Sequence, residues 1–314
     1  MRKKMTLLIV LVLIFSAGYL FLFIGGNLEF ALKLRGTKWL AILLTGTSIA
    51  ISTVIFQTIT GNRILTPSIM GLDSLYMLFQ TALLFLVGQS NLIHLGSEIN
   101  FVFSCGLMVV FSICFYYLLF KRKGTSIYLL LLVGIICGTF FSSFSSFMEM
   151  LIDPNEFQIV QDKSFAGFGN VNSDVLLLSV ILTGLVLLYL GKISKYLDVL
   201  VLGREEAMNL GVAYEKVVKR LLIVVAILTS IATALVGPIT FLGLIVSNIA
   251  YQLFPTHKHR ILIPAAALIS VLTLTFGQVI AERIFHFNTP ISVIINLAGG
   301  IYFLYLLLKG RKLV

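Results

Sequence analysis

Long apolar runs dominate the pattern of hydrophobic and polar positions along this chain. A membrane-spanning helix needs roughly 20 mostly apolar residues, because about 30 Å of hydrocarbon is crossed at about 1.5 Å per residue. Ten runs meet or approach this length, at about residues 5–25, 39–60, 69–88, 99–120, 127–150, 172–191, 218–237, 239–254, 261–281 and 290–308. They lack the short alternating segments of transmembrane β-strands. The pattern predicts an all-α, polytopic membrane protein with about ten transmembrane helices in a single domain, residues 1–314.

Two of these runs, the first and the eighth, allow more than one interpretation. The eighth is short and follows the seventh across Gly237 and Pro238, so the boundaries within 237–255 are poorly defined. The first run follows three basic residues, as a secretory signal peptide would, but its apolar stretch exceeds the roughly 7–15 residues of a signal core and no A-x-A site closes it. We therefore expect an uncleaved first span.

Composition agrees with a membrane protein and excludes an ordinary soluble enzyme. Of 314 residues 59% are hydrophobic and 11% charged, and the mean hydropathy is +1.05. Soluble domains are about half apolar and about a quarter charged. The net charge of +10 would suggest nucleic acid in a soluble protein. In a membrane protein the placement of the charges matters more, and we expect no nucleic-acid partner.

The positive charges orient the spans, because short cytoplasmic loops are enriched in Lys and Arg. When the 23 basic residues are sorted onto alternate sides of ten spans, with the N-terminus inside, eighteen fall inside and five outside. The outer five are Lys33, Arg35, Lys38, Lys163 and Arg283. Both termini are therefore predicted to be cytoplasmic.

Signatures of catalysis and metal binding are missing from the sequence. It contains no G-x-x-x-x-G-K-[ST] or G-x-S-x-G, no paired carboxylates within a span, and no histidine spacing typical of a metal site. His257 and His259 flank Lys258 in a basic inner loop, where we expect a solvated face. The spans are also poor in the deep charges typical of ion-coupled carriers. We expect no catalytic residue, bound metal or cofactor, and an energy source on another subunit.

The fifth run carries a polar stripe with spacings of three and four, which places its members on one helical face. Its residues are Gly134, Gly138, Ser142, Ser145, Ser146 and Glu149. Small residues allow close helix packing, but Glu149 is unfavourable against lipid, so packing and a water-lined path both remain open. On the second run a similar line of small residues leads to Gln57, the one position there where packing is not favoured.

The longest hydrophilic segment is the inner one at 192–220. Within it, Arg204 to Leu210 is predicted to form a short helix between Gly203 and Gly211, with Glu205 and Glu206 in its first turn. It is either a loop helix lying on the membrane or a docking helix for a cytoplasmic partner.

Four segments together resemble a known family pattern. Residues 57–71 (QTITGNRILTPSIMG) resemble Q-x-x-x-x-N-P-L-A-x-P-x-x-L-G, and residues 202–212 (LGREEAMNLGV) resemble L-G-x-x-x-A-x-x-L-G-V. Residues 237–246 (GPITFLGLIV) are similar to G-x-I-x-F-V-G-L-I-V, and residues 290–308 resemble the closing P-x-G-x-x-T-x-x-x-G-x-P-x-F-x-x-L-L. Over nearly its whole length the chain resembles the FecCD-type permeases of ABC importers for iron-siderophores, haem and vitamin B12.

This resemblance implies a vitamin B12 permease-like type II importer fold. Two such permeases work with two ATPase subunits, which use ATP and Mg, and with an extracytoplasmic substrate-binding protein. The segment 192–220 then contains the ATPase-coupling helix, with Gly203, Arg204, Glu205, Glu206, Ala207, Leu210 and Gly211. Arg35 and Lys38 match positions that meet acidic residues of the binding protein, and Arg283 lies near a third.

The departures from the family pattern are also informative. Ser247, Asn248 and Tyr251 stand where the family commonly has P-H-x-x-R, and Asn62-Arg63 replaces Asn-Pro. They resemble departures in the second, divergent permease of heterodimeric systems for catecholate or mixed catecholate-carboxylate siderophores, so we expect a heterodimer.

The expected function is that of a non-enzymatic permease in the bacterial cytoplasmic (inner) membrane. It would translocate a ferric siderophore by alternating access, along a path lined partly by Gln57, Ser142, Ser145, Ser146 and Glu149. The sequence does not identify the siderophore. Alternatives are a permease for haem or a cobalamin and, in another class, an ion-coupled secondary transporter. A membrane-embedded enzyme is disfavoured.

Overall fold

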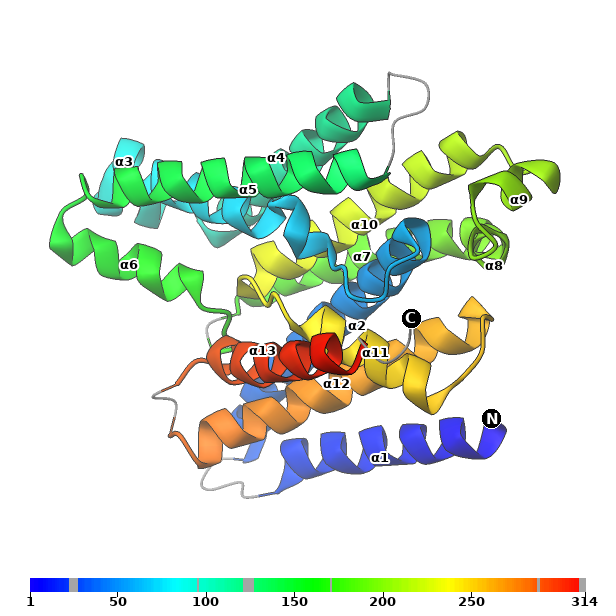
Figure 1. Cartoon of the computed structure of the whole chain (residues 1–314). Helices are drawn as coiled ribbons and strands as arrows, with labels where there is room; N and C mark the ends of the chain where they lie inside the picture. The colour runs from blue at the N-terminus through cyan, green and yellow to red at the C-terminus, as the bar shows by residue number, and fades with distance from the viewer. Residues whose placement is uncertain (23–27, 95, 121–126, 170, 287–288, 311–314) are drawn as a thin grey trace.

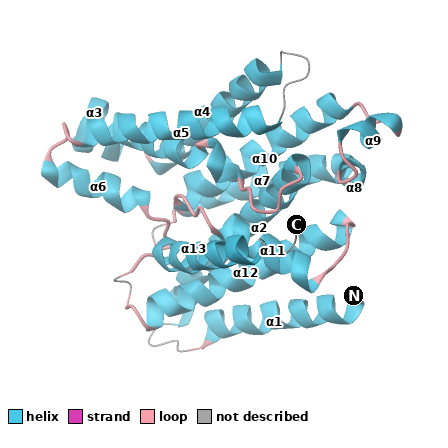
Figure 2. Ribbon diagram, viewed as in Figure 1, coloured by secondary structure: helices cyan, strands magenta, loops and turns pink. Residues whose placement is uncertain are grey.

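A computed structural model describes residues 1–22, 28–94, 96–120, 127–169, 171–286 and 289–310, and the regular elements in these ranges are all helical (Figure 2). The elements are α1 (Arg2–Phe21), α2 (Leu28–Thr60), the 3-10 helix η1 (Pro67–Met70), α3 (Leu72–His94), α4 (Ser97–Phe120), α5 (Ile127–Glu149), α6 (Pro154–Ser164), α7 (Ser173–Ile193), the 3-10 helix η2 (Ser194–Tyr196), α8 (Leu197–Leu200), α9 (Arg204–Asn209), α10 (Tyr214–Val236), α11 (Leu242–Leu253), α12 (His259–Arg283) and α13 (Ile291–Gly310). The predicted all-α class is confirmed.

The ten predicted runs each coincide with a helix. Within the described residues, seven helices are long and apolar enough to cross a membrane, and three shorter apolar segments, Leu72–Gly88, Leu242–Leu253 and Ile291–Leu306, belong to α3, α11 and α13. Most of the long helices run along one direction, tilted relative to one another (Figure 1). The N-terminus, α8 and α9 lie at one end, and α6 lies at the other (Figure 1). The distribution of basic residues makes the end with α9 the inner one.

The core is built around α2, α10 and α12. Helices α2 and α10 are mostly buried, whereas α1, α5 and α7 leave most of their surface exposed. Small residues allow α2 and α12 to approach closely. A Cβ added to Gly46 of α2 would lie 3.1 Å from both Leu274 Cδ1 and Ser270 Oγ of α12. Because lipid gives packed apolar helices no hydrophobic advantage, such close contacts are the main source of helix association in a membrane.

The second span begins at Leu28, eleven residues before the predicted start at 39. Lys38, expected in an outer loop, therefore lies within α2, is 8% exposed, and places its Nζ 3.6 Å from Glu282 Oε1 of α12. Arg35 donates hydrogen bonds to the carbonyls of Tyr19 (3.1 Å) and Leu22 (2.6 Å) at the end of α1. Both cations thus find partners on neighbouring helices, and these partners allow the helix to extend through a basic segment.

Helix α6 was not predicted, because it is short and lies in a polar external segment. Pro154 occupies its first residue, where a missing N–H costs no intrahelical hydrogen bond. Val160 is buried in a small cluster with Leu84 of α3 and Ile152. This cluster fixes α6 beside α3 at the outer end.

The polar stripe of α5 is partly a packing face. After α2 the chain returns through η1 to Gly71, whose φ of +79° favours glycine. A Cβ on Gly71 would lie 2.7 Å from Gly138 Cα, and a Cβ on Gly134 would lie 3.0 Å from Met70 Cα. The glycine half of the stripe therefore serves close packing against η1 and the start of α3.

Candidate functional site

The short inner helix predicted between two glycines is present as α9. Gly203 precedes it with φ of +98° and Gly211 follows it with φ of +81°, both in the region that favours glycine. Ala207 is fully buried among side chains of α8 and α10, including Leu200 and Val218. One side of α9 is therefore anchored on the helices behind it.

The opposite side of α9 is exposed. It carries two carboxylates and several large apolar side chains, and we call it the inner docking surface: Leu202, Glu205, Glu206, Met208 and Leu210. Arg204 is engaged laterally, because its Nη2 lies 3.1 Å from Glu215 Oε1 of α10. Large apolar side chains grouped on an exposed surface indicate an interaction site. This combination suits docking of another protein better than a purely solvated loop.

His259 connects this inner end to the core, and the expectation that it is solvated is wrong. Its side chain is 3% exposed. Its backbone N–H donates to Asp198 Oδ1 (2.8 Å), its Nδ1 lies 2.7 Å from the same oxygen, and its Nε2 lies 2.8 Å from Thr58 Oγ1. Asp198 is on α8, just before α9, whereas His259 begins α12 and Thr58 is near the end of α2. The segment leading into α9 is thus fastened to two core helices.

The unusual residues at 63, 248 and 251 meet in one cluster beside Gln57. The carbonyl of Arg63 accepts hydrogen bonds from Gln57 Nε2 (2.7 Å) and Asn248 Nδ2 (3.0 Å). The Arg63 guanidinium lies 4.6 Å from the centroid of the Tyr251 ring, a distance suited to a cation–π interaction. The departures from the family pattern are therefore physically connected.

Gln57 also lines an inner cavity of about 390 Å³ between the end of α2, the α8–α9 segment and the loop before α12.

The predicted path residues on α5 separate into two groups. Ser145 is buried, lies 2.9 Å from Thr81 Oγ1 of α3, and donates to Glu149 Oε1 (2.9 Å). Ser142 and Ser146 are exposed. Ser145 and Glu149 make contacts between α5 and α3, whereas Ser142 and Ser146 are available to a partner or a path.

The predicted docking cations lie near one another at the outer ends of α2 and α12. Glu282 forms a group with Tyr19, Lys38 and Gln278 that we call the outer polar cluster. Its Oε1 accepts hydrogen bonds from Tyr19 (3.1 Å) and Gln278 (2.8 Å) and faces Lys38. Arg283, the next residue, is exposed. The structure thus brings the three cations to one region but directs Lys38 inward.

Asp73 is a partly buried carboxylate that the pattern of paired carboxylates does not single out. It lies in the first turn of α3, where the helix N-terminus favours a negative charge. Its Oδ1 is 3.4 Å from Oγ1 of Thr233, on α10, and its Oδ2 is 3.5 Å from Oγ1 of Thr240, in the break between α10 and α11. Its position two residues after Gly71, inside an apolar run, is the sequence signal that could have revealed it.

Comparison with known proteins agrees with this arrangement. The FecCD transport family model matches residues 5–309. The petrobactin import system permease protein YclO of Bacillus subtilis (strain 168) is 55% identical over 313 residues, which are 99% of either chain. Two petrobactin import permeases of Bacillus anthracis, FatC and FatD, are 38% and 27% identical, over 90% and 97% of this chain and 79% and 91% of theirs.

A solved structure gives the same architecture. It is described as an inward-facing conformation of a metal-chelate type ABC transporter, and it matches with a TM-score of 0.84 at 23% identity, covering 98% of this chain and 99% of that one. This likeness shows the type II importer permease fold. The family match spans nearly all of the sequence, and the chain belongs to the FecCD transport family.

Proposed function

We propose that this protein is the permease subunit of a bacterial ABC importer that carries a ferric, mixed catecholate-carboxylate siderophore of the petrobactin type across the cytoplasmic membrane. The observation that supports this most strongly is 55% identity, over 99% of both chains, to a petrobactin import permease. The siderophore carries the iron, so the chain itself needs no iron ligand. It does not catalyse ATP hydrolysis, which is assigned to partner subunits.

The partners follow from the same comparison and from the surfaces. Two different permeases of Bacillus anthracis carry the petrobactin import name, and this chain is more similar to one than to the other. We therefore infer a heterodimer with a second permease. Two ATPase subunits, using ATP and Mg, would bind the inner docking surface, and a substrate-binding protein would bind the outer end.

Coupling would begin at α9. Movement of the ATPases displaces the inner docking surface, and Asp198, His259 and Thr58 pass the displacement to α12 and α2. Both helices extend to the outer polar cluster, where Lys38 of α2 faces Glu282 of α12. A shift at the inner end can thus reach the outer end through two continuous helices, which is a physical requirement for alternating access.

At the outer end we assign different tasks to the three basic residues. Arg283 is exposed and Arg35 partly exposed, so their charges can attract and orient an acidic binding protein. Lys38 would act indirectly by holding Glu282 and the outer ends of α2 and α12 together.

The central test is uptake by the complete importer reconstituted in vesicles. With ATP enclosed and the binding protein outside, iron-loaded petrobactin should accumulate, and ionophores that collapse ion gradients should not prevent it. Uptake that needs a gradient but no ATPase would instead establish the ion-coupled alternative. Preferential transport of haem or a cobalamin would overturn the substrate assignment.

The docking assignment can be tested in the same vesicles with Arg283→Glu. Because exposed charges mainly affect encounter, we expect roughly a tenfold rise in the binding-protein concentration needed for half-maximal uptake, and a weaker dependence on salt. Lys33→Glu is the matched control, an exposed outer cation with no assigned role. Equal behaviour of Arg283→Glu and the unmodified protein would remove Arg283 from the docking surface.

The path assignment predicts different accessibility along α5. A membrane-impermeant thiol reagent should label Ser142→Cys and Ser146→Cys in the assembled importer in at least one nucleotide state. Ser145→Cys, a buried position on the same helix, should stay unlabelled. If Ser142→Cys and Ser146→Cys are never labelled, both residues serve packing rather than the path.

A further inference from the structure

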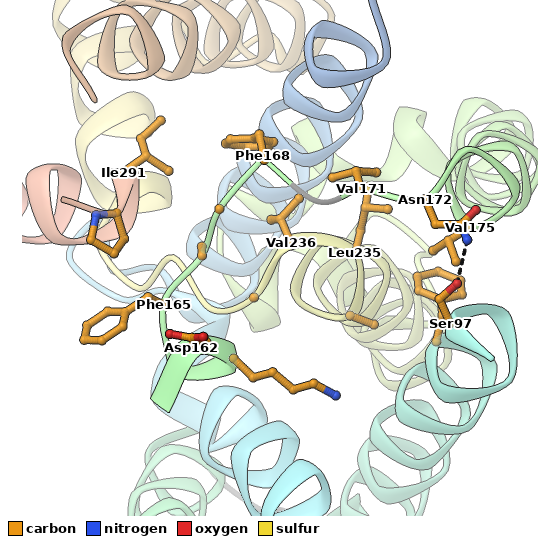
Figure 3. A pocket seen from close by; sticks show the side chains of 18 of the residues that line it. Ser97, Asp162, Phe165, Phe168, Val171, Asn172, Val175, Leu235, Val236 and Ile291 are labelled. Carbon is orange, nitrogen blue, oxygen red and sulfur yellow. Dashed lines mark hydrogen bonds between the residues drawn. The ribbon is translucent and has the colours of Figure 1, made fainter. Parts of the chain in front are cut away.

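Lys163, like Lys33, is an outer cation for which the charge pattern suggests no role. The structure places it on α6, in the wall of an outer cavity of about 730 Å³. The cavity lies among the outer ends of α4, α7, α10 and α12 and the start of α13, and residues 165–169 and 171–172, between α6 and α7, line it (Figure 3). Its volume is in the range of roughly 300–1,000 Å³ that small-molecule sites occupy.

The Lys163 ammonium is held in position by a network of neutral side chains. Its Nζ donates to Gln80 Oε1 at 2.6 Å. The amide of Gln80 is itself oriented, because its Nε2 donates to Ser104 Oγ (2.9 Å) and Asn100 Oδ1 (3.3 Å). This arrangement fixes the carbonyl of Gln80 toward α6, and it leaves two of the three ammonium protons for another acceptor.

The charge of Lys163 is not neutralised within the described part of the chain. No carboxylate there lies within ion-pair distance of its ammonium. The neighbouring Asp162 is exposed, whereas Lys163 is only partly so. Withdrawing an ammonium from water without a counter-charge is costly, and an anionic ligand would offset that cost.

The rest of the wall is mixed: apolar side chains line it together with the carboxylate of Asp162 and three amide side chains. The amides belong to Asn100, Asn172 and Gln278, and each also donates a hydrogen bond within the protein. Asn172 is oriented by a hydrogen bond from its Nδ2 to Ser97 Oγ at 2.7 Å, shown dashed in Figure 3. Gln278 also donates to Glu282 of the outer polar cluster, so the cavity adjoins the surface assigned to the binding protein.

We infer that this cavity receives the incoming chelate and that Lys163 binds its anionic oxygens. The inference rests on the proposed function and adds to it a residue that binds the substrate. Deprotonated catecholate and carboxylate oxygens give such a ferric chelate negative charge, whereas a ferric trihydroxamate is neutral at its metal centre. Lys163 therefore selects anionic over neutral chelates at the outer end of the permease.

The test compares Lys163→Gln, Lys163→Arg and Lys33→Gln in reconstituted importer. Loss of a charge-assisted hydrogen bond should raise the half-saturating concentration of iron-loaded petrobactin roughly tenfold in Lys163→Gln. Lys163→Arg keeps the charge and should retain most of the affinity, and Lys33→Gln removes an outer charge elsewhere and should change nothing. If the unmodified importer transports petrobactin and Lys163→Gln matches it, this inference fails and the proposed function stands. If the unmodified importer transports none, the proposed function fails.

A second measurement uses the unmodified importer and so does not depend on the folding of a variant. Iron-loaded petrobactin should protect Lys163 from an amine-reactive reagent, as quantified by mass spectrometry, while a neutral ferric trihydroxamate should not. Equal protection by both chelates, or by neither, would overturn the assignment.

Discussion

Inside a lipid bilayer every backbone N–H and C=O must find a partner within the protein, so the chain can leave a helix only where other helices enclose it. The described residues include two such interruptions, the return from α2 to α3 and the break between α10 and α11. The first is enclosed by the contact of Gly71 with Gly138, and at the second a Cβ on Gly237 would lie 3.1 Å from Ala166 Cα. Asp73 connects them through Thr233 and Thr240. Close packing of small residues therefore allows the fold to include non-helical chain within the bundle.

One pair of helices, α2 and α12, links the two ends of the protein. Near the inner end, Thr58 of α2 meets His259 of α12, and at the outer end Lys38 of α2 meets Glu282 of α12. Between these contacts Gly46 allows α2 and α12 to pack closely. The α2–α12 pair is thus joined near both ends and along its length. It provides a physical connection between the surface assigned to the ATPases and the cavity assigned to the substrate.

The sequence predicts the features that depend on local pattern. Continuous apolar runs locate ten of the helices, and the two glycines around residues 204–210 locate α9, because both signals are local in the sequence. Apart from the missed helix α6, the failures concern pairings between residues far apart in the chain. Lys38 was expected to be exposed because Glu282 is 244 positions away, and His259 was expected to be solvated because Asp198 and Thr58 lie on other helices. The sequence leaves the role of the α5 stripe open for the same reason, since only the position of α3 shows that Ser145 and Glu149 face a neighbour.

The most direct test of this account measures how tightly ATP hydrolysis is coupled to uptake when the inner contact is removed. In reconstituted importer, His259→Phe should raise the number of ATP molecules hydrolysed per siderophore transported several-fold, while the thermal stability of the permease pair is monitored. His257→Phe, at an exposed position two residues away, should leave the ratio unchanged. If His259→Phe couples ATP hydrolysis to uptake as well as the unmodified protein does, α2 and α12 do not receive the movement of α9 through this contact.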